Sequence, residues 1–246
     1  MHTTAGVSAL VVAMLLGKRA GWPKTLMLPH SPALTMAGAA LLWVGWFGFN
    51  GGSALAANDD AASAIINTHL AASVAALVWL AIEKISVGKP TSIGFATGAI
   101  AGLATVTPAA GYIAPGAAML MGVAATSVCY PMIQLVKKRL EIDDSLDVFA
   151  VHGVGGMLGS VLLAPFLSEG LGGVGYAEGM DLAALLGDLR DRLLAGIEIR
   201  HIHRHRTQRL AEIEGGAAAL ALGSGQAASA FALLNLARAG DNVVSA

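Results

Sequence analysis

The sequence predicts an all-α protein: a polytopic membrane helix bundle of about six transmembrane helices, followed by a helical, partly amphipathic C-terminal tail. Three observations support this fold class. The 246 residues are 55% hydrophobic and only 13% charged, whereas a soluble domain is about one quarter charged. Apolar stretches long enough to span a bilayer recur between residues 1 and 168. The basic residues of this region are confined to alternate connections between those stretches.

The individual transmembrane segments follow from their length. A spanning helix needs about 20 mostly apolar residues. The first segment is shorter, with no positive region before it and no small-residue cleavage site after it, so we expect the remnant of a spanning helix rather than a signal peptide. The predicted segments are residues 3–17, 33–50, 59–82, 91–108, 115–136 and 147–167.

The connections between the segments predict their orientation. All Lys and Arg residues before residue 168 lie in the connections 18–32, 83–90 and 137–146, whereas 50–60 and 107–115 carry none. Lys and Arg are retained on the cytoplasmic side of a membrane. We therefore expect a multi-pass protein of the cell membrane whose three basic connections face the cytoplasm. The basic residues are Lys18, Arg19, Lys24, Lys84, Lys89, Lys137, Lys138 and Arg139.

Composition also excludes several other classes of protein. The net charge of −1 lacks the basic bias of a nucleic-acid-binding protein, so we expect no nucleic-acid partner. Cys129 is the only cysteine, which excludes a disulfide framework and a CxxC metal site. Gly and Ala fill stretches such as 94–104 and 152–160, and small residues let helix backbones approach closely in lipid. The helices are therefore expected to form a tightly packed bundle.

Polar groups at membrane depth are functional candidates because placing them there is costly. A carboxylate at a predicted helix start, such as Asp147, either caps free N–H groups or acts in transport. His69 either lines a route or forms an interhelical hydrogen bond. His152 has glycines at 153, 155, 156 and 159 that would open space beside it. The complete set is His2, Asn50, Asp59, Asp60, Asn67, His69, Asp147 and His152.

An aromatic cluster ends the second predicted segment. The stretch LLWVGWFGFNGGS (41–53) contains Trp43, Trp46, Phe47 and Phe49 at the outward end of its helix. Aromatic residues there are typical of the belt at a membrane interface. Near a pore, the same rings would stack on a cation or close the path, but the residues alone favour the interface belt.

Four stretches, in order along the chain, carry a family resemblance. They are GWFGFNGGSALAAND (45–59), NTHLAASVAALVW (67–79), GAIAGLATVTPAAGYI (98–113) and DVFAVHGVGGMLGS (147–160). Together they resemble the later helices of the ammonium transporter family (Amt/Mep/Rh). The similarity covers residues 1–180, reaches LGGVGYAEG (171–179), and defines the predicted membrane domain.

The resemblance implies a channel rather than an enzyme, with no cofactor. It implies a homotrimer in which each subunit has its own hydrophobic pore. NH₄⁺ would be recruited outside, deprotonated and conducted as NH₃, because a bare ion in an apolar path carries a prohibitive solvation cost. The implied partners are ammonium or ammonia, the lipid bilayer and a regulatory PII-type protein.

The resemblance also assigns residues to the pore. His152 matches the second of two pore histidines whose rings hydrogen-bond to each other, and His2 matches the first. Phe49 matches the inner of two stacked phenylalanines at the outer mouth, and Ser53 matches a hydroxyl near the outer recruitment site. Trp46, from the same motif, is expected to line the pore. The candidate pore and transport residues are His2, Trp46, Phe49, Ser53, Asp147 and His152.

The chain departs from the family's pattern at its start. The family fold is built from an inverted repeat, as many transporters are, and the similarity begins at its fifth helix. We therefore expect a truncated ammonium-transporter fold that lacks the first four helices, with their gate phenylalanine, recruitment tryptophan and the aspartate ahead of the first histidine. Such a chain could be inactive, or could be a non-functional or chimeric fragment.

The second departure is the C-terminal tail. Residues 181–206 are charged and amphipathic, and we expect a linker there. Residues 207–246 resemble the N-terminal part of the pyridoxal-phosphate-dependent enzymes of sulfur amino-acid metabolism, so in the chimeric alternative the tail derives from such a sulfhydrylase or lyase. Ser224, Gly225 and Gln226 match its phosphate-binding motif, in which helix N–H groups hold the phosphate. No Schiff-base lysine accompanies them, so no functional cofactor site is expected.

Two further features of the tail have competing interpretations. HIHRHR (201–206) would bind a metal through alternating histidines, but interleaved arginines and the lack of a completing ligand favour a solvated basic segment. No metal is expected. The stretch 216–237 is apolar enough to resemble a spanning helix, yet its insertion would place the basic residues between 190 and 209 outside, against the charge rule. We expect an extramembrane helical tail.

Overall fold

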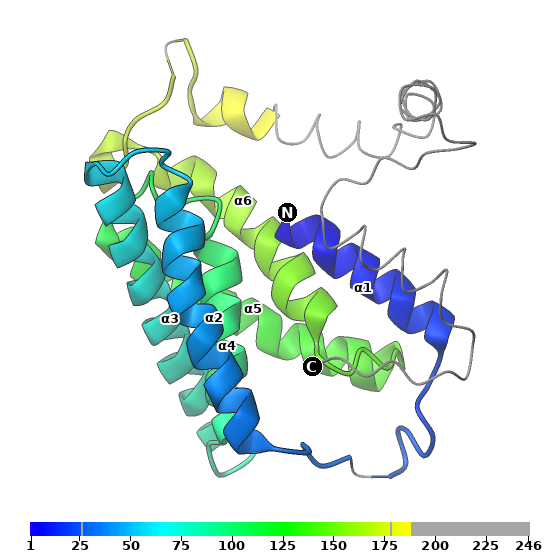
Figure 1. Cartoon of the computed structure of the whole chain (residues 1–246). Helices are drawn as coiled ribbons and strands as arrows, with labels where there is room; N and C mark the ends of the chain where they lie inside the picture. Colours follow the sequence, from blue (N-terminus) through cyan, green and yellow to red (C-terminus); the bar gives the residue numbers. More distant parts are fainter. Residues whose placement is uncertain (26, 178, 188–246) are drawn as a thin grey trace, which may run out of the picture.

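The computed structural model describes residues 1–25, 27–177 and 179–187, and within these ranges the chain is helical with no strand (Figure 1). The predicted all-α membrane helix bundle is confirmed. HIHRHR, Ser224, Gly225, Gln226 and the rest of the chain from residue 188 lie outside the described residues. The elements are α1 (His2–Leu16), α2 (Pro32–Gly52), α3 (Asp59–Ser86), α4 (Ser92–Val106), α5 (Pro115–Gln134), η1 (Leu135–Arg139), η2 (Phe149–Val154), α6 (Gly155–Phe166) and η3 (Glu169–Leu171).

Side-chain caps fix where three of these helices begin. Ser31, Asn58 and Thr91 each accept a hydrogen bond from the backbone N–H three residues later, which satisfies a group that has no partner within the helix. Pro32 follows the first of these caps, where its missing N–H and fixed φ suit a helix start. These short-range signals explain why the helices begin close to the predicted boundaries.

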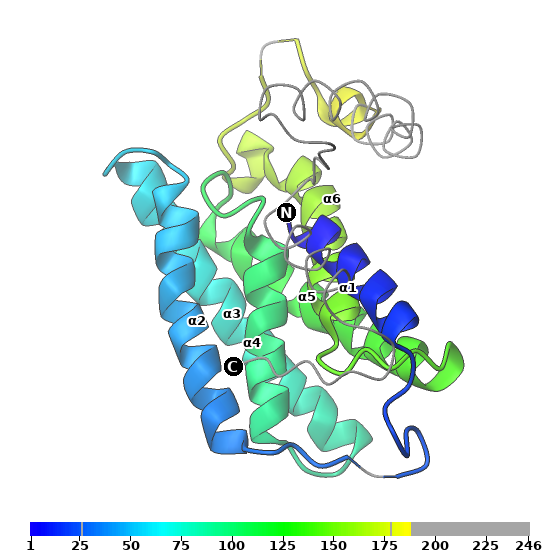
Figure 2. The same ribbon diagram turned by 45° about the vertical axis from the view of Figure 1, so that its right-hand side comes forward.

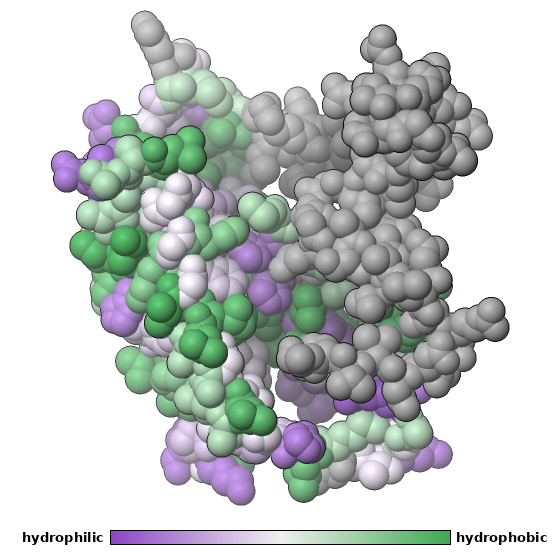
Figure 3. Space-filling view, viewed as in Figure 1, coloured by the Kyte–Doolittle hydropathy of each residue, from purple (hydrophilic) through white to green (hydrophobic). Residues whose placement is uncertain are grey.

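Four helical stretches are long and apolar enough to cross a membrane: Pro32–Gly52, Asp59–Ser86, Pro115–Arg139 and Phe149–Phe166. The apolar helices α1 and α4 have 15 residues each and are only about 22 Å long. In Figure 3, hydrophobic residues cover much of the face formed by α2 and α3, and hydrophilic residues gather at its upper and lower ends. This distribution suits a surface surrounded by lipid between two aqueous layers.

The basic connections share one end of the bundle, as predicted. The connections before α2 and between α3 and α4 both lie at the lower end in Figure 1. Lys18 and Arg19, which follow α1, form ion pairs with Glu141 and Asp143 in the connection between η1 and η2. All three basic connections are therefore on the same side.

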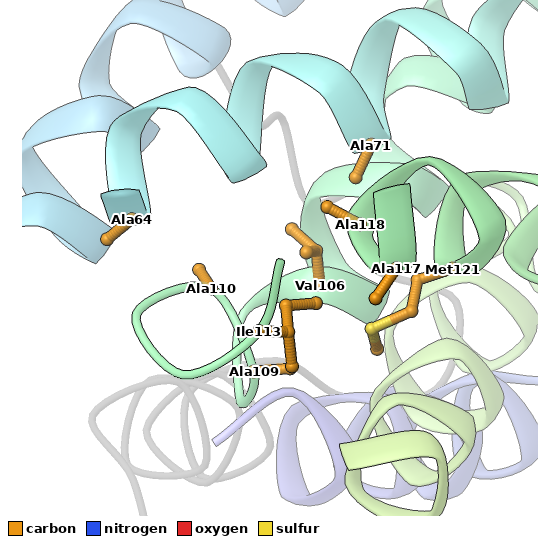
Figure 4. Close-up of a cluster of buried hydrophobic side chains, with 9 residues drawn as sticks. All are labelled: Ala64, Ala71, Val106, Ala109, Ala110, Ile113, Ala117, Ala118 and Met121. Carbon is orange, nitrogen blue, oxygen red and sulfur yellow. The ribbon is translucent and has the colours of Figure 1, made fainter. Parts of the chain in front are cut away.

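The densest packing surrounds α3, which contacts α2, α4 and α5. Ala71 and Ala75 of α3 are fully buried. A Cβ atom built on Gly102 of α4 or Gly122 of α5 would lie 2.5 Å from the carbonyl oxygen of Ala71, so these backbones touch. Figure 4 shows the cluster of small and medium side chains that fills the outer part of this core. Packing of this kind is what drives helix association in lipid.

The turn between α4 and α5 depends on one buried side chain. Asn67 of α3 is fully buried, and its Nδ2 donates to the carbonyl oxygens of Ala110 and Ile113 at 2.8 and 2.7 Å. Non-helical backbone at membrane depth needs such partners because lipid supplies none. Asn67, one of the polar candidates, therefore has a structural role.

The first helix lies apart from this core. α1 packs mainly against η2 and less against α6, and Figures 1 and 2 both show its N-terminal end beside α6. It begins with His2, while η2 carries His152. The two histidines, 150 residues apart in the chain, are thus placed on packed elements.

Candidate functional site

The rings of His2 and His152 face each other. Their Nδ1 atoms are 3.3 Å apart, their ring centroids are 5.4 Å apart, and the ring planes are inclined by 30°. At this separation the Nδ1–H group of one ring donates a hydrogen bond to the Nδ1 atom of the other, which requires the two rings to be in complementary tautomers. The sequence analysis assigned these two residues to a pair, and the structure brings them together.

Glycines allow the helices that carry the pair to come this close. A Cβ atom on Gly6 of α1 would collide with the backbone of Gly153 in η2. One built on Gly156 would lie 2.9 Å from the Cβ of His2 and from the backbone nitrogen of Thr3. The glycines after His152 therefore let α1 pack directly against this segment. The sequence had led us to expect only open space beside His152.

The sixth membrane segment also begins irregularly. Residues Phe149–Val154 form a π-helical turn before the α-helix starts at Gly155. The N–H of Phe149 donates to the carboxylate of Asp144 at 2.8 Å, so Asp144 caps this element. π-Turns widen a helix locally and are frequent at functional sites, and this one contains His152.

Two aromatic rings complete the cluster from α2. Trp46 stacks on His2 with centroids 5.2 Å apart and planes inclined by 18°, and its ring is 6.4 Å from that of His152. Phe49 meets His2 edge-on at 6.1 Å. We call His2, Trp46, Phe49 and His152 the histidine–aromatic cluster. Trp46 is 8% exposed, so it faces the interior and not the lipid interface, whereas Phe49 remains 40% exposed.

A threonine that the sequence analysis did not single out holds the tryptophan in place. Trp46 Nε1 donates to Thr107 Oγ1 at 2.9 Å, and Thr107 Oγ1 donates to the carbonyl oxygen of Leu103 at 2.7 Å. Thr107 lies in the stretch TVTPAAGYI, which carried part of the family resemblance. The resemblance was therefore the available signal, although nothing local linked Thr107 to α2.

In the part of the chain that the structure describes, the cluster contains a buried polar atom that is free to bind a further group. His2 Nε2 is buried and has no hydrogen-bond partner within residues 1–25, 27–177 and 179–187. The same part of the chain contains no group of three or more His, Cys, Asp and Glu side chains that could hold a metal ion. A small neutral molecule that donates or accepts hydrogen bonds fits next to such an atom better than an ion does.

The other two candidate residues lie outside the cluster. Ser53, at the C-terminal end of α2, is exposed and donates from Oγ to the carbonyl oxygen of Phe49 at 2.8 Å. Asp147, before η2, forms an ion pair of 2.7 Å with Lys137. Ser53 is therefore near the cluster through Phe49, whereas Asp147 belongs to the end that carries the basic connections.

His69 occupies a different environment from the histidine pair. Its side chain is exposed on α3, 5.5 Å from the ring of Trp43 and 6.0 Å from that of Phe47. The second aromatic pair of α2 therefore accompanies His69, and only Trp46 and Phe49 accompany the paired histidines. This contrast makes His69 a useful reference histidine.

The fold and the cluster define a class of protein: a helical membrane protein with paired histidines beneath aromatic rings between its helices. A profile of the Ammonium Transporter Family matches residues 1–237. The chain belongs to this family, and it is a multi-pass membrane protein. The match extends beyond residue 180, into the region that the sequence analysis assigned to a linker and to a second resemblance; that second resemblance stays a prediction.

Individual relatives support the same assignment. The ammonium transporter Amt1 of Archaeoglobus fulgidus is 53% identical over 162 residues, covering 65% of this chain and 41% of the relative. The ammonium transporter of Aquifex aeolicus is 46% identical over 173 residues, covering 70% and 40%. The chain thus spans less than half the length of either relative.

Solved structures are similar as well. The crystal structure of Saccharomyces cerevisiae Mep2 superposes with a TM-score of 0.66 at 36% identity, covering 76% of this chain and 45% of that one. A sensor Amt protein superposes with a TM-score of 0.68 at 29% identity, covering 76% and 46%. The arrangement of helices around the cluster is therefore similar to that of solved proteins of this kind.

Proposed function

We propose that the chain forms part of an ammonium-conducting pore, in which His2 and His152 line the narrow part and Trp46 and Phe49 cover it. The observation that carries this proposal is the histidine pair, with its Nδ1 atoms 3.3 Å apart, beneath the stacked ring of Trp46. The protein would act as a transporter and not as an enzyme.

The chemistry of the cluster favours a neutral species in the narrow part. A bare NH₄⁺ would lose its hydration among aromatic and apolar groups, at a cost of many kcal/mol unless it gave up its proton. NH₃ needs only hydrogen-bond partners. The unpaired His2 Nε2 offers one, and neutral imidazoles donate and accept along a path without holding a charge there. We therefore propose that NH₄⁺ is recruited outside, that its proton is released or relayed separately, and that NH₃ is conducted through the narrow part.

The remaining roles extend this proposal to both ends of the pore. Ser53, whose hydroxyl hydrogen-bonds to the backbone at Phe49, is proposed for the outer recruitment site. Asp147, paired with Lys137, is proposed as a polar transport residue at the inner end. Assembly as a homotrimer with one pore per subunit and regulation by a PII-type protein belong to the same proposal through the family resemblance.

Flux into liposomes tests the role of the pair. The full chain is reconstituted, and uptake of methylammonium or ammonium is compared with uptake by empty vesicles. His152→Ala should reduce flux to the level of empty vesicles, because it removes one partner of the 3.3 Å pair. His69→Ala is the matched control, since it removes an imidazole outside the cluster, and it should leave flux unchanged.

Two results would contradict the proposal. Undiminished and selective uptake by His152→Ala would remove the histidine pair from the conduction path. Flux through the unsubstituted chain that does not exceed that of empty vesicles would show that the chain does not conduct.

A further inference from the structure

Charged side chains tie the connection after α1 to the connection before η2. Arg19 donates three hydrogen bonds to the carboxylate of Asp143: from its backbone N–H at 2.9 Å, from Nε at 2.8 Å and from Nη2 at 2.6 Å. Lys18 pairs with Glu141 at 2.6 Å. The two elements that carry His2 and His152 are therefore linked a second time, at the end of α1 far from His2.

The two ion pairs differ in burial. The side chain of Asp143 has no exposed surface, whereas those of Lys18 and Glu141 are 45% and 61% exposed. Burial alone would raise the pKa of Asp143, but the hydrogen bonds and charge of Arg19 outweigh it and hold that pKa below its ordinary value. Two guanidinium nitrogens that bind one buried carboxylate fix the direction of the contact as well as its distance. An exposed ion pair contributes little to stability.

The contact between α1 and η2 needs such a restraint along the helix axis. Gly6 and Gly153 approach each other closely in this contact, and two glycines present no side chains that interlock. Ridges and grooves of side chains are what normally fix how one helix is placed along another. At the contact between Gly6 and Gly153, α1 and η2 are close together, but no side chains of these two residues resist a shift of α1 along its axis.

Sliding would separate the histidines. A shift of α1 by one residue along its axis is about 1.5 Å. A displacement of this size at right angles to the line between the Nδ1 atoms would lengthen the present 3.3 Å to about 3.6 Å, beyond hydrogen-bond range. Arg19 follows the last turn of α1, and Asp143 precedes His152 by nine residues. This pair therefore joins the two connections at a second point, away from the glycine contact.

We propose that Arg19 and Asp143 are positioning residues that fix α1 along η2, so that His2 meets His152. The inference rests on the proposed function for the meaning of the histidine pair, but the positioning itself is a structural property. It is measurable whether or not the chain conducts ammonium.

Distances between spin labels test the positioning directly. Cysteines replace Val11 on α1 and Val161 on α6, which are 41% and 43% exposed; the native Cys129 is fully buried and is not labelled. The distance distribution is measured by pulsed electron paramagnetic resonance on the full chain in lipid nanodiscs. Arg19→Gln should broaden it and shift its mean by about 1.5 Å, one helical rise.

Matched variants separate positioning from general effects. Arg19→Lys keeps the positive charge but loses the two-nitrogen contact with Asp143. It should therefore give a distance distribution of intermediate width. Lys18→Ala removes the neighbouring exposed ion pair and should leave the distribution unchanged. Asp143→Asn should reproduce Arg19→Gln; should it not fold, the two Arg19 variants decide alone. A pair that only raised stability would change the unfolding temperature and not the distribution in the folded protein.

An unchanged distribution of spin-label distances in Arg19→Gln would overturn the inference, and so would equal broadening of that distribution in Lys18→Ala. In liposomes, Arg19→Gln should lower flux by roughly tenfold or more, because displacements of about 1 Å at a reacting site have effects of that size. If the unsubstituted chain gives no flux, the proposed function fails, and the distance measurement still decides the positioning.

Discussion

The core around α3 and the contact between α1 and η2 both bring helix backbones together at glycines, yet their surroundings differ. In the core, Gly122 lies against the fully buried Ala71, and buried Asn67 satisfies two carbonyl groups. At the α1 contact, the glycines adjoin His2, whose Nε2 has no partner in the described part of the chain. Both regions contain a buried polar atom without a partner among the described residues, since Asn67 Oδ1 and Thr105 Oγ1 in the core also have none, but the second region pairs two histidines. We therefore expect the first region to determine stability and the second to determine the proposed function.

The largest effect is expected from a methyl group in the core. Gly122→Ala would place Cβ 2.5 Å from the carbonyl oxygen of Ala71, which forces α3 and α5 apart. Overpacking of this kind costs about 1–3 kcal/mol or more. Unfolding in mixed detergent, followed by circular dichroism, measures the loss of unfolding free energy.

Gly116→Ala is the matched control on the same helix, because nothing lies within 4 Å of its added Cβ. Replacing an unconstrained helical glycine stabilises by about 0.4–1 kcal/mol. Equal unfolding free energies for the two variants would show that the backbone contact at Gly122 does not limit stability.

The same change at the α1 contact should act on function more than on stability. Gly156→Ala would place Cβ 2.9 Å from the Cβ of His2, and α1 can move away because it packs only on η2 and α6 among its major contacts. We expect flux to fall by about tenfold, with a smaller loss of unfolding free energy than in Gly122→Ala.

Gly45→Ala on α2 serves as the control for the flux measurement, since its added Cβ meets nothing within 4 Å. A Gly156→Ala protein that conducts normally, or one that unfolds as readily as Gly122→Ala, would abolish the functional distinction between the two regions.

The smallest effect concerns pH and the ion pair of Arg19 and Asp143. The pKa of Asp143 is lower in the folded chain than its ordinary value. Its contribution to stability is therefore complete above the ordinary pKa of about 3.9 and is lost as the pH falls through the lower, folded value. The unfolding temperatures of the unsubstituted chain and of Asp143→Asn should differ at neutral pH and converge in strong acid. A constant difference at all pH values would contradict this.

Much of the fold could be predicted because its signals lie in residues that are close together in the sequence. Apolar runs predicted the six helical segments, of which four are long and apolar enough to cross a membrane, and the placement of Lys and Arg predicted the shared end of three connections. Caps such as Ser31 and Thr91 are also local. The short length of α1 was expected from the sequence, whereas the end of α4 at Val106 is not visible in hydropathy, since the turn after it is largely apolar as well.

The site could be predicted only in part, for a physical reason. His2 and His152 were paired through a family resemblance, since no periodicity links residues 150 positions apart. The bond from Trp46 to Thr107 and the two-nitrogen contact from Arg19 to Asp143 were missed. Such partners lie 61 and 124 residues apart, and only the packing of helices brings them together.

The turn held by Asn67 has a consequence for the choice of membrane. α3 has 28 residues and is about 42 Å long, whereas its neighbour α4 is about 22 Å, and the chain after α4 turns without a helix until α5 begins at Pro115. Because Asn67 replaces water as the partner of Ala110 and Ile113, that turn does not depend on reaching the aqueous layer. In bilayers of different thickness, we therefore expect hydrophobic mismatch to be taken up at the long α3 rather than at the turn.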